Sequence, residues 1–348
     1  MTGTRLALAD FCEIIQGGRH KLSGNDFVED GFPAYGAGGM NGLLPSYEFE
    51  EPAVILSSIG ARCGKCFFAD GKWSSLANTQ VIRPHPGEAD CKFLWYQLND
   101  ESRWPRAGTG QPFIKPSDVK SHLVFLPPLG EQRRIAAILD KADALRAKRR
   151  EALAQLDRLA QSIFVDMFGD PVSNSRGWDQ ASFEQFFLDK TSSCEKLPSS
   201  GYQGEGVFPV IDQGQAAIAG FCDDESLLAE VALPVTLFGD HTRTVKHVNF
   251  PFVVGADGAK VLKAVEWVNP RFASHLLANL PIPNLGYSRH MKEVKRLTFI
   301  VPPRVLQDSF EIRLTALDKV RVQHQRAALS SDFLSESLQH RAFRGELR

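Results

Sequence analysis

The stretch "FLPPLGEQRRIAAILDKADALRAKRREALAQLDRLAQSIFVDMFGDP", residues 125–171, predicts one long charged helix in the middle of the chain. The helix follows a Pro-Pro turn, and apolar residues recur in it at steps of three and four. It spans roughly 30 residues, about 45 Å at 1.5 Å per residue. Because an apolar stripe of that length is unstable when exposed, the pattern predicts a partner helix.

The end of the chain carries a second copy of this pattern, "FIVPPRVLQDSFEIRLTALDKVRVQHQRAALSSDFLSESLQHRAFRGEL", residues 299–347. A shift of 175 residues aligns the Pro-Pro pair at 127–128 with that at 302–303, Gln132 with Gln307, and Phe168 with Phe343. The two halves are therefore related. Each half runs as a globular module, a Pro-Pro turn and a helix.

The two helices are expected to pair through a coiled-coil seam. In the first helix the seam comprises Ala142, Leu145, Arg149, Ala152, Leu156, Leu159 and Ile163, and in the second Leu317, Val320, His324, Ala327, Ser331, Leu334 and Leu338. Pairing of the two copies would be antiparallel and would give a pseudo-twofold molecule. Arg149 and His324 share one repeat position, where they either fix the register or extend to solvent.

The modules are expected to be mixed α/β units that are rich in loops. Short β-like runs cover 52–60, 64–73 and 78–86 in the first and 233–240, 246–258 and 260–268 in the second, and helix candidates cover 91–100 and 270–280. The fold class is thus α/β: two mixed α/β modules separated by two long antiparallel coiled-coil helices. The expected segments are 1–125 and 172–300 for the modules, and 126–171 and 301–348 for the helical spacers.

Composition is that of an ordinary globular chain. Of 348 residues, 43% are hydrophobic and 23% are charged, enough to fill a core, and the net charge of −1 leaves only local basic surfaces for a polyanion. Six scattered cysteines fit a reducing compartment, and Cys63–Cys66 lacks the second ligand pair that a zinc site needs, so no metal is expected. The opening residues do not read as a signal peptide and no apolar run approaches a membrane span, so we expect a cytoplasmic protein.

Several motifs together resemble one family. The central stretch from Pro128 to Pro171 resembles the central region of specificity subunits of type I restriction-modification enzymes. The strand pattern "SSIGARCGKCFFADGKWSSLANTQVIRP" at 57–84, the two-module arrangement and the closing "FRGEL" resemble the same family. One departure is that Leu306-Gln307 stands where the first copy has Glu131-Gln132.

This resemblance implies a noncatalytic subunit that reads DNA. Each module would read one half of a split, asymmetric site in double-stranded DNA, and the paired helices would set the gap. The helices would also dock methyltransferase subunits, two in number on the family's pattern, and restriction subunits would join for cleavage. This chain would bind no cofactor, since S-adenosylmethionine, ATP and magnesium are used by the partner subunits.

Two other classes of function were weighed. A nuclease would need clustered carboxylates and a lysine, and "EVK" at 293–295 has that form; "DVK" at 118–120 holds the same place in the first half, which favours a structural role. A coiled-coil scaffold that docks partners without touching DNA would not need loops that mix amides, arginines and aromatics. Salt-sensitive binding to duplex DNA distinguishes these classes.

The candidate DNA contacts lie in loops of both modules, where Arg suits guanine, Asn and Gln suit adenine, and Lys suits phosphate. In the first module they are Arg19, His20, Lys21, Arg62, Lys65, Asn78, Gln80, Thr109, Gln111 and Lys115. In the second they are Gln213, Gln215, His241, Arg243, Lys246, Ser288, Arg289 and His290.

Overall fold

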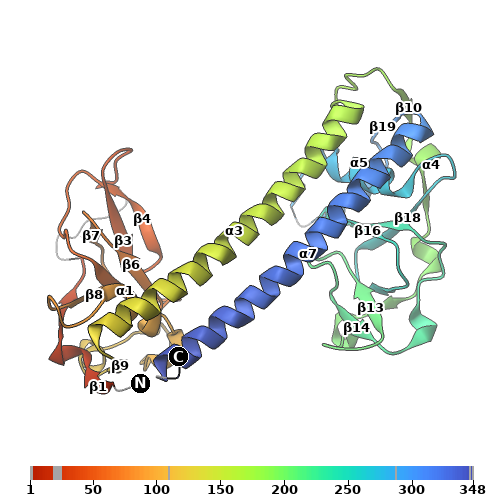
Figure 1. Ribbon diagram of the computed structural model, residues 1–348. Coiled ribbons are helices and arrows are strands. Elements are labelled where there is room, and N and C mark those ends of the chain that lie inside the picture. Colours follow the sequence, from red (N-terminus) through yellow and green to blue (C-terminus); the bar gives the residue numbers. More distant parts are fainter. Residues whose placement is uncertain (1–2, 19–25, 109, 287, 345, 347–348) are drawn as a thin grey trace. The chain divides into compact units, whose positions relative to one another are not determined.

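The computed structural model describes residues 3–18, 26–108, 110–286, 288–344 and 346 (Figure 1). The chain divides into two compact units. The first unit contains Met1–Glu151 and Gln325–Arg348, and the second contains Ala152–His324. Each unit thus holds one module together with part of each long helix.

The two long helices are α3, Leu129–Phe168, and α7, Arg304–Phe343. Both are rich in Ala, Leu, Arg and Gln, which favour the helical conformation. In the first unit Ile135 and Leu139 of α3 pack in one cluster with Leu338 and Ala342 of α7. In the second unit the end of α3 packs on the start of α7, where Phe164 contacts Phe310. The helices are therefore antiparallel in either unit, as the repeat predicts.

The observed stripe corrects four of the fourteen predicted seam positions. Ala142, Arg149, Leu156 and Ile163 are partly buried as expected, and so are their repeat equivalents Leu317, His324, Ser331 and Leu338. Leu145, Leu159, Val320 and Leu334, however, are between 40% and 56% exposed. The stripe passes instead through the residue after each of these, at 146, 160, 321 and 335, which are partly or fully buried. A one-residue shift on a helix rotates a side chain by about 100°. The prediction took the more apolar of two adjacent residues at each of these four positions, and that residue lies on the exposed face.

Arginine ion pairs occupy this corrected stripe. In the first unit the Arg146 guanidinium lies 2.5 Å from a carboxylate oxygen of Asp332 on α7. In the second unit Arg321 lies 2.6 Å from Asp157 on α3. The two pairs are related by the same 175-residue shift, since Arg146 corresponds to Arg321 and Asp157 to Asp332. Exposed pairs of this kind contribute about 1 kcal/mol or less, so their main effect is to favour one register of the helices.

The first module is built from three small sheets. Their strand orders are β2-β8-β5-β6, β4-β3-β7 and β1-β9. The strands are β1 Thr4–Ala7, β2 Cys12–Gln16, β3 Phe32–Gly36, β4 Gly39–Leu44, β5 Ala53–Ser57, β6 Cys66–Ala69, β7 Ser74–Ser75, β8 Thr79–Pro84 and β9 Leu123–Leu126, and the helices are α1 Cys91–Leu98 and α2 Pro116–Lys120. Short 3-10 turns cover Leu8–Asp10 and Glu101–Arg103.

The second module repeats this plan. Its strand orders are β11-β18-β15-β16, β12-β17-β13-β14 and β10-β19. The strands are β10 Asp179–Ala181, β11 Phe187–Asp189, β12 Lys196–Leu197, β13 Phe208–Ile211, β14 Gly220–Cys222, β15 Val235–Gly239, β16 Val245–Val248, β17 Val253–Gly255, β18 Ala259–Ala264 and β19 Phe299–Val301. The helices are α4 Phe183–Phe186, α5 Pro270–Asn279 and α6 Met291–Val294, and 3-10 turns cover Thr191–Ser193, Ser199–Gly201 and Glu225–Leu227. Two of the three sheets have equivalent strand orders in both modules, and the third carries the additional strand β12 in the second module. This agreement supports the internal repeat and the mixed α/β class.

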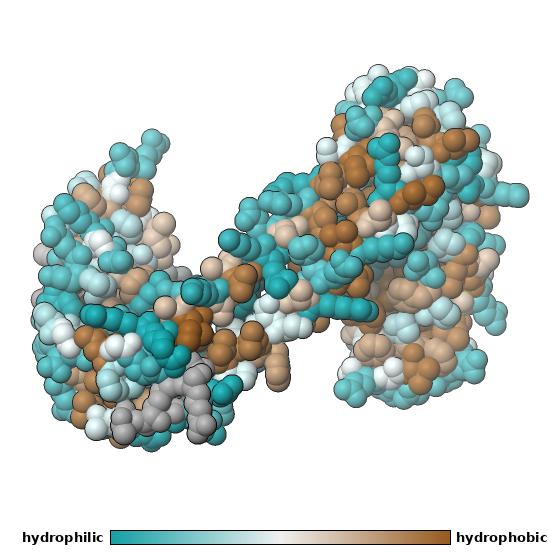
Figure 2. Space-filling view, viewed as in Figure 1, coloured by the Kyte–Doolittle hydropathy of each residue, from teal (hydrophilic) through white to brown (hydrophobic). Residues whose placement is uncertain are grey.

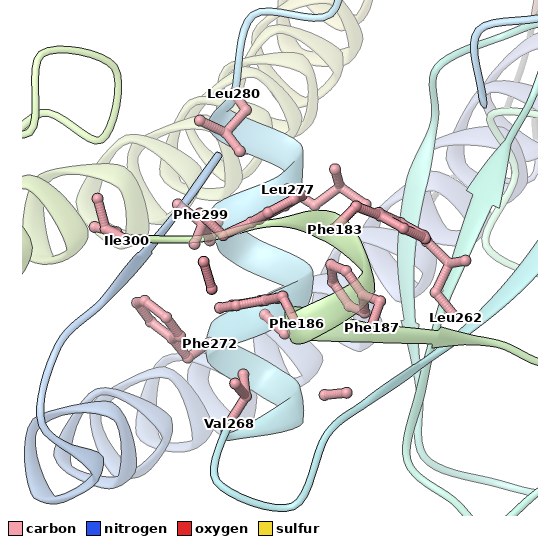
Figure 3. Packing of buried hydrophobic residues seen from close by; sticks show 14 of the residues in the cluster. Phe183, Phe186, Phe187, Leu262, Val268, Phe272, Leu277, Leu280, Phe299 and Ile300 are labelled. Atoms are coloured by element: carbon pink, nitrogen blue, oxygen red, sulfur yellow. The ribbon is translucent and has the colours of Figure 1, made fainter. Parts of the chain in front are cut away.

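The core of the second unit is aromatic. Phe272 on α5, Phe299 on β19 and Phe186 on α4 are fully buried in one cluster (Figure 3). Phe186 stacks on Phe299 with ring centroids 4.8 Å apart. The cluster extends to Phe164 and Phe168 of α3, so the module is packed directly onto the long helices. Burying side chains of this size contributes about 1.5–3 kcal/mol each to the stability of the unit that carries the loops.

Candidate nucleic-acid interface

Three loops of the second unit meet at one surface. They are the β13–β14 hairpin loop at 212–219, the β15–β16 loop at 240–244 and the segment at 281–290. The side-chain oxygen of Gln213 accepts the His241 N–H at 3.1 Å, and Gln215 donates to the Thr244 hydroxyl at 3.1 Å. The Arg243 guanidinium donates to the Ile282 carbonyl at 3.1 Å. Five predicted contacts, Gln213, Gln215, His241, Arg243 and Lys246, therefore lie in one connected loop cluster.

Lys246 anchors this cluster from β16. Its ammonium donates to the carbonyls of Asp212 at 2.8 Å and Ala216 at 2.6 Å. Partial burial lowers the pKa of Lys246 below its usual range, because desolvation disfavours the charged form. The ammonium therefore holds the hairpin loop in place, a role that the sequence pattern alone did not predict.

His290 is a correction to the predicted contact set. Its side chain is 0% exposed. One ring nitrogen lies 2.8 Å from the Asp240 carbonyl oxygen, and the other accepts the Leu285 N–H at 3.2 Å. With both ring nitrogens engaged by the backbone, His290 ties the 281–290 segment to the β15–β16 loop. Ser288 and Arg289, the two residues before it, are exposed and stay candidates.

The first unit forms the equivalent loop cluster. The Ser58 carbonyl, after β5, accepts the Ile114 N–H at 2.9 Å, just as the Asp240 carbonyl, after β15, accepts the His290 N–H at 2.8 Å. The Ser58 N–H donates to Asn78, and the Arg62 guanidinium donates to the Gly38 carbonyl in the β3–β4 hairpin, both at 2.8–2.9 Å. The loops that carry Arg62, Asn78 and Gln111 therefore converge.

The remaining first-unit predictions divide into three groups. Arg62, Asn78, Gln111 and Lys115 are exposed, and Lys65 is partly buried. Gln80 is a correction, since it lies within β8, is 3% exposed and donates to the Ile114 carbonyl at 3.3 Å. Four predicted contacts, Arg19, His20, Lys21 and Thr109, lie outside the described residues.

Three described residues other than glycine adopt a left-handed backbone. Asn78 has φ of 66°, Asn174 has φ of 47° and Arg243 has φ of 60°. Asn tolerates this region because its side chain hydrogen-bonds locally, whereas Arg pays a penalty of roughly 1–2 kcal/mol. The cost therefore falls on Arg243, whose guanidinium is fixed by its hydrogen bond to the Ile282 carbonyl.

Two lysines that the sequence did not predict as contacts lie beside the loop cluster of the second unit. Lys260 on β18 lies 3.9 Å from Asp240, which is itself buried. Lys196 on β12 has a lowered pKa, first because of burial and then because of the nearby Lys260 and Arg289 charges. Strand residues more than 60 positions apart gather here, so no local motif marks them. Lys196, Lys260 and Arg289 lie near one another at the edge of the loops, where Asp240 and Asp257 partly offset their charge.

Two buried glutamines, Gln132 and Gln307, fasten each module to its helix. Gln132 accepts the Asp90 N–H at 2.8 Å and donates to the Pro127 carbonyl at 2.7 Å. Gln307 does the same with Asn269 and Pro302, at 2.7 Å and 2.8 Å. The repeat aligns these two glutamines in the sequence, and their equivalent hydrogen bonds explain why both halves have a glutamine at this position.

The described residues give little support for reactive cysteines, a metal site or a membrane-spanning helix. Cys63 and Cys66 are buried and direct their thiols toward the Ser58 and Leu98 carbonyls. Burial raises the pKa of the Cys66 thiol. Within the described ranges no three His, Cys, Asp or Glu side chains are grouped as metal ligands. In that same part of the chain, no helix has the length and apolarity to cross a membrane.

Comparison with known proteins agrees with this architecture. Residues 5–156 match the family model described as "Type I restriction modification DNA specificity domain". This stretch, less than half of the 348-residue chain, is similar to the type I specificity domain. The matched region covers the first module and most of α3, and the repeat extends the same plan to the second half.

The relatives that resemble this chain are distant in sequence. The proposed MjaX type I specificity subunit of Methanocaldococcus jannaschii is 23% identical over 312 residues, 76% of this chain and 71% of that protein. The proposed type I specificity subunit S.MpnORF89P of Mycoplasma pneumoniae is 27% identical over 100 residues, so the chain spans only 30% of that relative's length and the match covers 28% of this chain. The crystal structure of the type I restriction-modification S subunit from M. genitalium has the same fold, with a TM-score of 0.69, 16% identity and coverage of 99% of this chain and 96% of that one.

Proposed function

We propose that this chain reads a bipartite, asymmetric site in double-stranded DNA and directs methyltransferase and restriction subunits to it. The observation that carries the proposal is the repeated loop cluster. Two units of the same plan each present one set of amide, arginine and hydroxyl groups, which are the side chains that bind base edges and phosphates. Because the exposed loop residues differ between the units, each unit would read a different half-site.

The chain itself would supply recognition and no chemistry. The residues of "DVK" fall in the short helix α2, and "EVK" covers the last two residues of the short helix α6 and the residue that follows it. Glu293 in the second is paired with Arg296 at 3.0 Å. This supports a structural role for both tripeptides, and S-adenosylmethionine, ATP and magnesium would be used by partner subunits.

Exposed apolar side chains on the long helices suit partner docking. Leu329 and Phe333, four residues apart on α7, are 71% and 75% exposed. Leu145 on α3 belongs to the same unit and is also exposed. Brown hydrophobic residues interrupt the teal surface along the helices (Figure 2). A methyltransferase subunit that covers this surface would bury area that otherwise faces water.

Methylome sequencing of cells with and without this gene tests the proposal. We expect one bipartite motif to lose methylation when the gene is deleted. Docking is tested separately by Phe333→Asp, which should abolish co-purification of the methyltransferase subunit, with Ser330→Asp on the same helix as the control. An unchanged methylome would reject the proposed function.

A further inference from the structure

A basic groove in the first unit extends the loop cluster toward α3. It has a volume of about 680 Å³ and lies between the module and the helix. The module contributes Met40 and Lys65, and α3 contributes Ala147 and Arg150. Strands β3, β4 and β6 and helix α1 lie beside the first half of α3 (Figure 1). The groove is therefore lined by the module on one side and by α3 on the other.

The charge of the groove is unbalanced. Among the described residues, the Lys65 ammonium and the Arg150 guanidinium have no acidic partner. Asp143, the one acid among the lining residues, already accepts the Tyr96 hydroxyl at 3.1 Å and pairs with Arg146 at 3.2 Å. Two cations on opposite walls thus face one channel without compensation, which favours an anionic occupant.

The groove is continuous with the loops that carry the predicted base contacts. The Lys65 N–H donates to the Arg62 carbonyl at 3.0 Å, so both residues belong to one turn. Arg62 in turn donates to Gly38 in the β3–β4 hairpin, and Met40 in that hairpin is 60% exposed at the groove. A duplex that contacts the Arg62 loop with its bases would bring an adjacent stretch of backbone to Lys65 and Arg150.

The second unit lacks this charge. Strand pairing places Thr244 where the first unit has Lys65, since Cys66 pairs with Leu56 as Val245 pairs with Phe238. The pocket at the equivalent place in the second unit contains His247, His275 and Arg271. Burial lowers the pKa of each histidine to about 4, so both are neutral near pH 7, and Arg271 pairs with Asp318 at 2.6 Å. The one cation that lines this second pocket therefore has an acidic partner, unlike Lys65 and Arg150 in the first.

We propose that this groove binds the sugar-phosphate backbone of double-stranded DNA next to the first half-site, with Lys65 and Arg150 each contacting a phosphate. The inference rests on the proposed function. It adds a sequence-independent contact at one half-site only, so the two ends of the recognised site differ in how much they depend on salt.

Titration of DNA into the assembled complex with its methyltransferase subunits tests this. The probes are a fluorescent duplex that carries the methylated motif and one with scrambled half-sites, and the variant is Lys65→Gln with Arg150→Gln. Each lost phosphate contact reduces the slope of log K against log salt by about 0.9, so the slope should fall by about two and affinity by roughly 30-fold near 150 mM salt. The loss should be equal on both duplexes, because phosphate contacts carry no sequence information.

Two controls separate the possible outcomes. Lys141→Gln with Lys148→Gln removes two exposed charges of α3 that do not line the groove, and should leave the slope unchanged. Lys65→Arg with Arg150→Lys keeps the charges and should retain the wild-type slope. An unchanged slope in the glutamine variant, or a loss confined to the motif duplex, would overturn the groove assignment. A wild-type complex that shows no preference for the motif would instead reject the proposed function.

Discussion

The buried glutamines that join each module to its helix give the sharpest test of the packing. Gln307 is 1% exposed, and both of its hydrogen bonds, to the Asn269 N–H and the Pro302 carbonyl, are buried. Gln307→Leu keeps the volume of the side chain close to the original but leaves both backbone groups unpaired. An unsatisfied buried group costs about 1–3 kcal/mol, so the free energy of unfolding should fall by about 2–5 kcal/mol.

The repeat supplies a graded comparison. Gln132→Leu in the first unit should cost less, because the Asp90 N–H that it leaves unpaired is only partly buried and can reach water. Arg133→Leu changes the exposed neighbour of Gln132 and should shift stability by no more than about 0.5 kcal/mol. Urea unfolding measured by circular dichroism gives each value.

Hydrogen exchange locates the effect. In Gln307→Leu, the amides of α5, which Asn269 caps, should exchange faster than in the wild type, while those of α1 should not change. The reasoning about the glutamines would be refuted if Gln307→Leu lost less than 1 kcal/mol, or if it lost no more than the Arg133 control.

Three further outcomes are expected. Burial lowers the pKa of His247 and His275 from 6.5 to about 4. Between these values the unfolded chain binds more protons than the folded chain, so the free energy of unfolding should fall as pH drops from 6.5 toward 4. Urea unfolding at pH 7 and pH 5 should show a smaller fall in this free energy for His275→Gln than for the wild type. Ala160→Asp should weaken the helix pair by about 2 kcal/mol or more, whereas Leu159→Asp should be nearly neutral because that side chain faces water, and thermal unfolding distinguishes the two. Purified alone with S-adenosylmethionine, ATP and magnesium, the chain should neither methylate nor cut DNA, and turnover in a partner-free preparation would count against a pure recognition role.

Much of the fold could be predicted from the sequence because it depends on local patterns and on a repeat. The run at 52–60 contains β5, and the helix candidate at 91–100 contains α1. The run at 246–258 instead divides into β16 and β17, which join different sheets. Residue type predicts a strand, whereas the sheet that it joins depends on distant partners.

The site was harder to predict because polar side chains in a loop serve two roles. His290 and Gln80 have the chemistry of DNA contacts, yet their hydrogen bonds go to backbone groups distant in the sequence, at Asp240 and Ile114. The predicted seam was wrong at four positions for a related reason. Leu145 is more apolar than its neighbour Arg146, but Arg146 gains a carboxylate partner at Asp332 on the other helix. Such compensation is set by tertiary contacts and leaves no mark in the local pattern.

The most direct test of the central claim is to exchange the first module, residues 1–125, for that of a related specificity subunit and to sequence the methylome of the cells that carry the hybrid. If each unit reads one half-site, the first half of the motif should change while the second half and the intervening gap stay the same. A hybrid that altered both halves, or that methylated a single uninterrupted motif, would contradict separate reading by the two units.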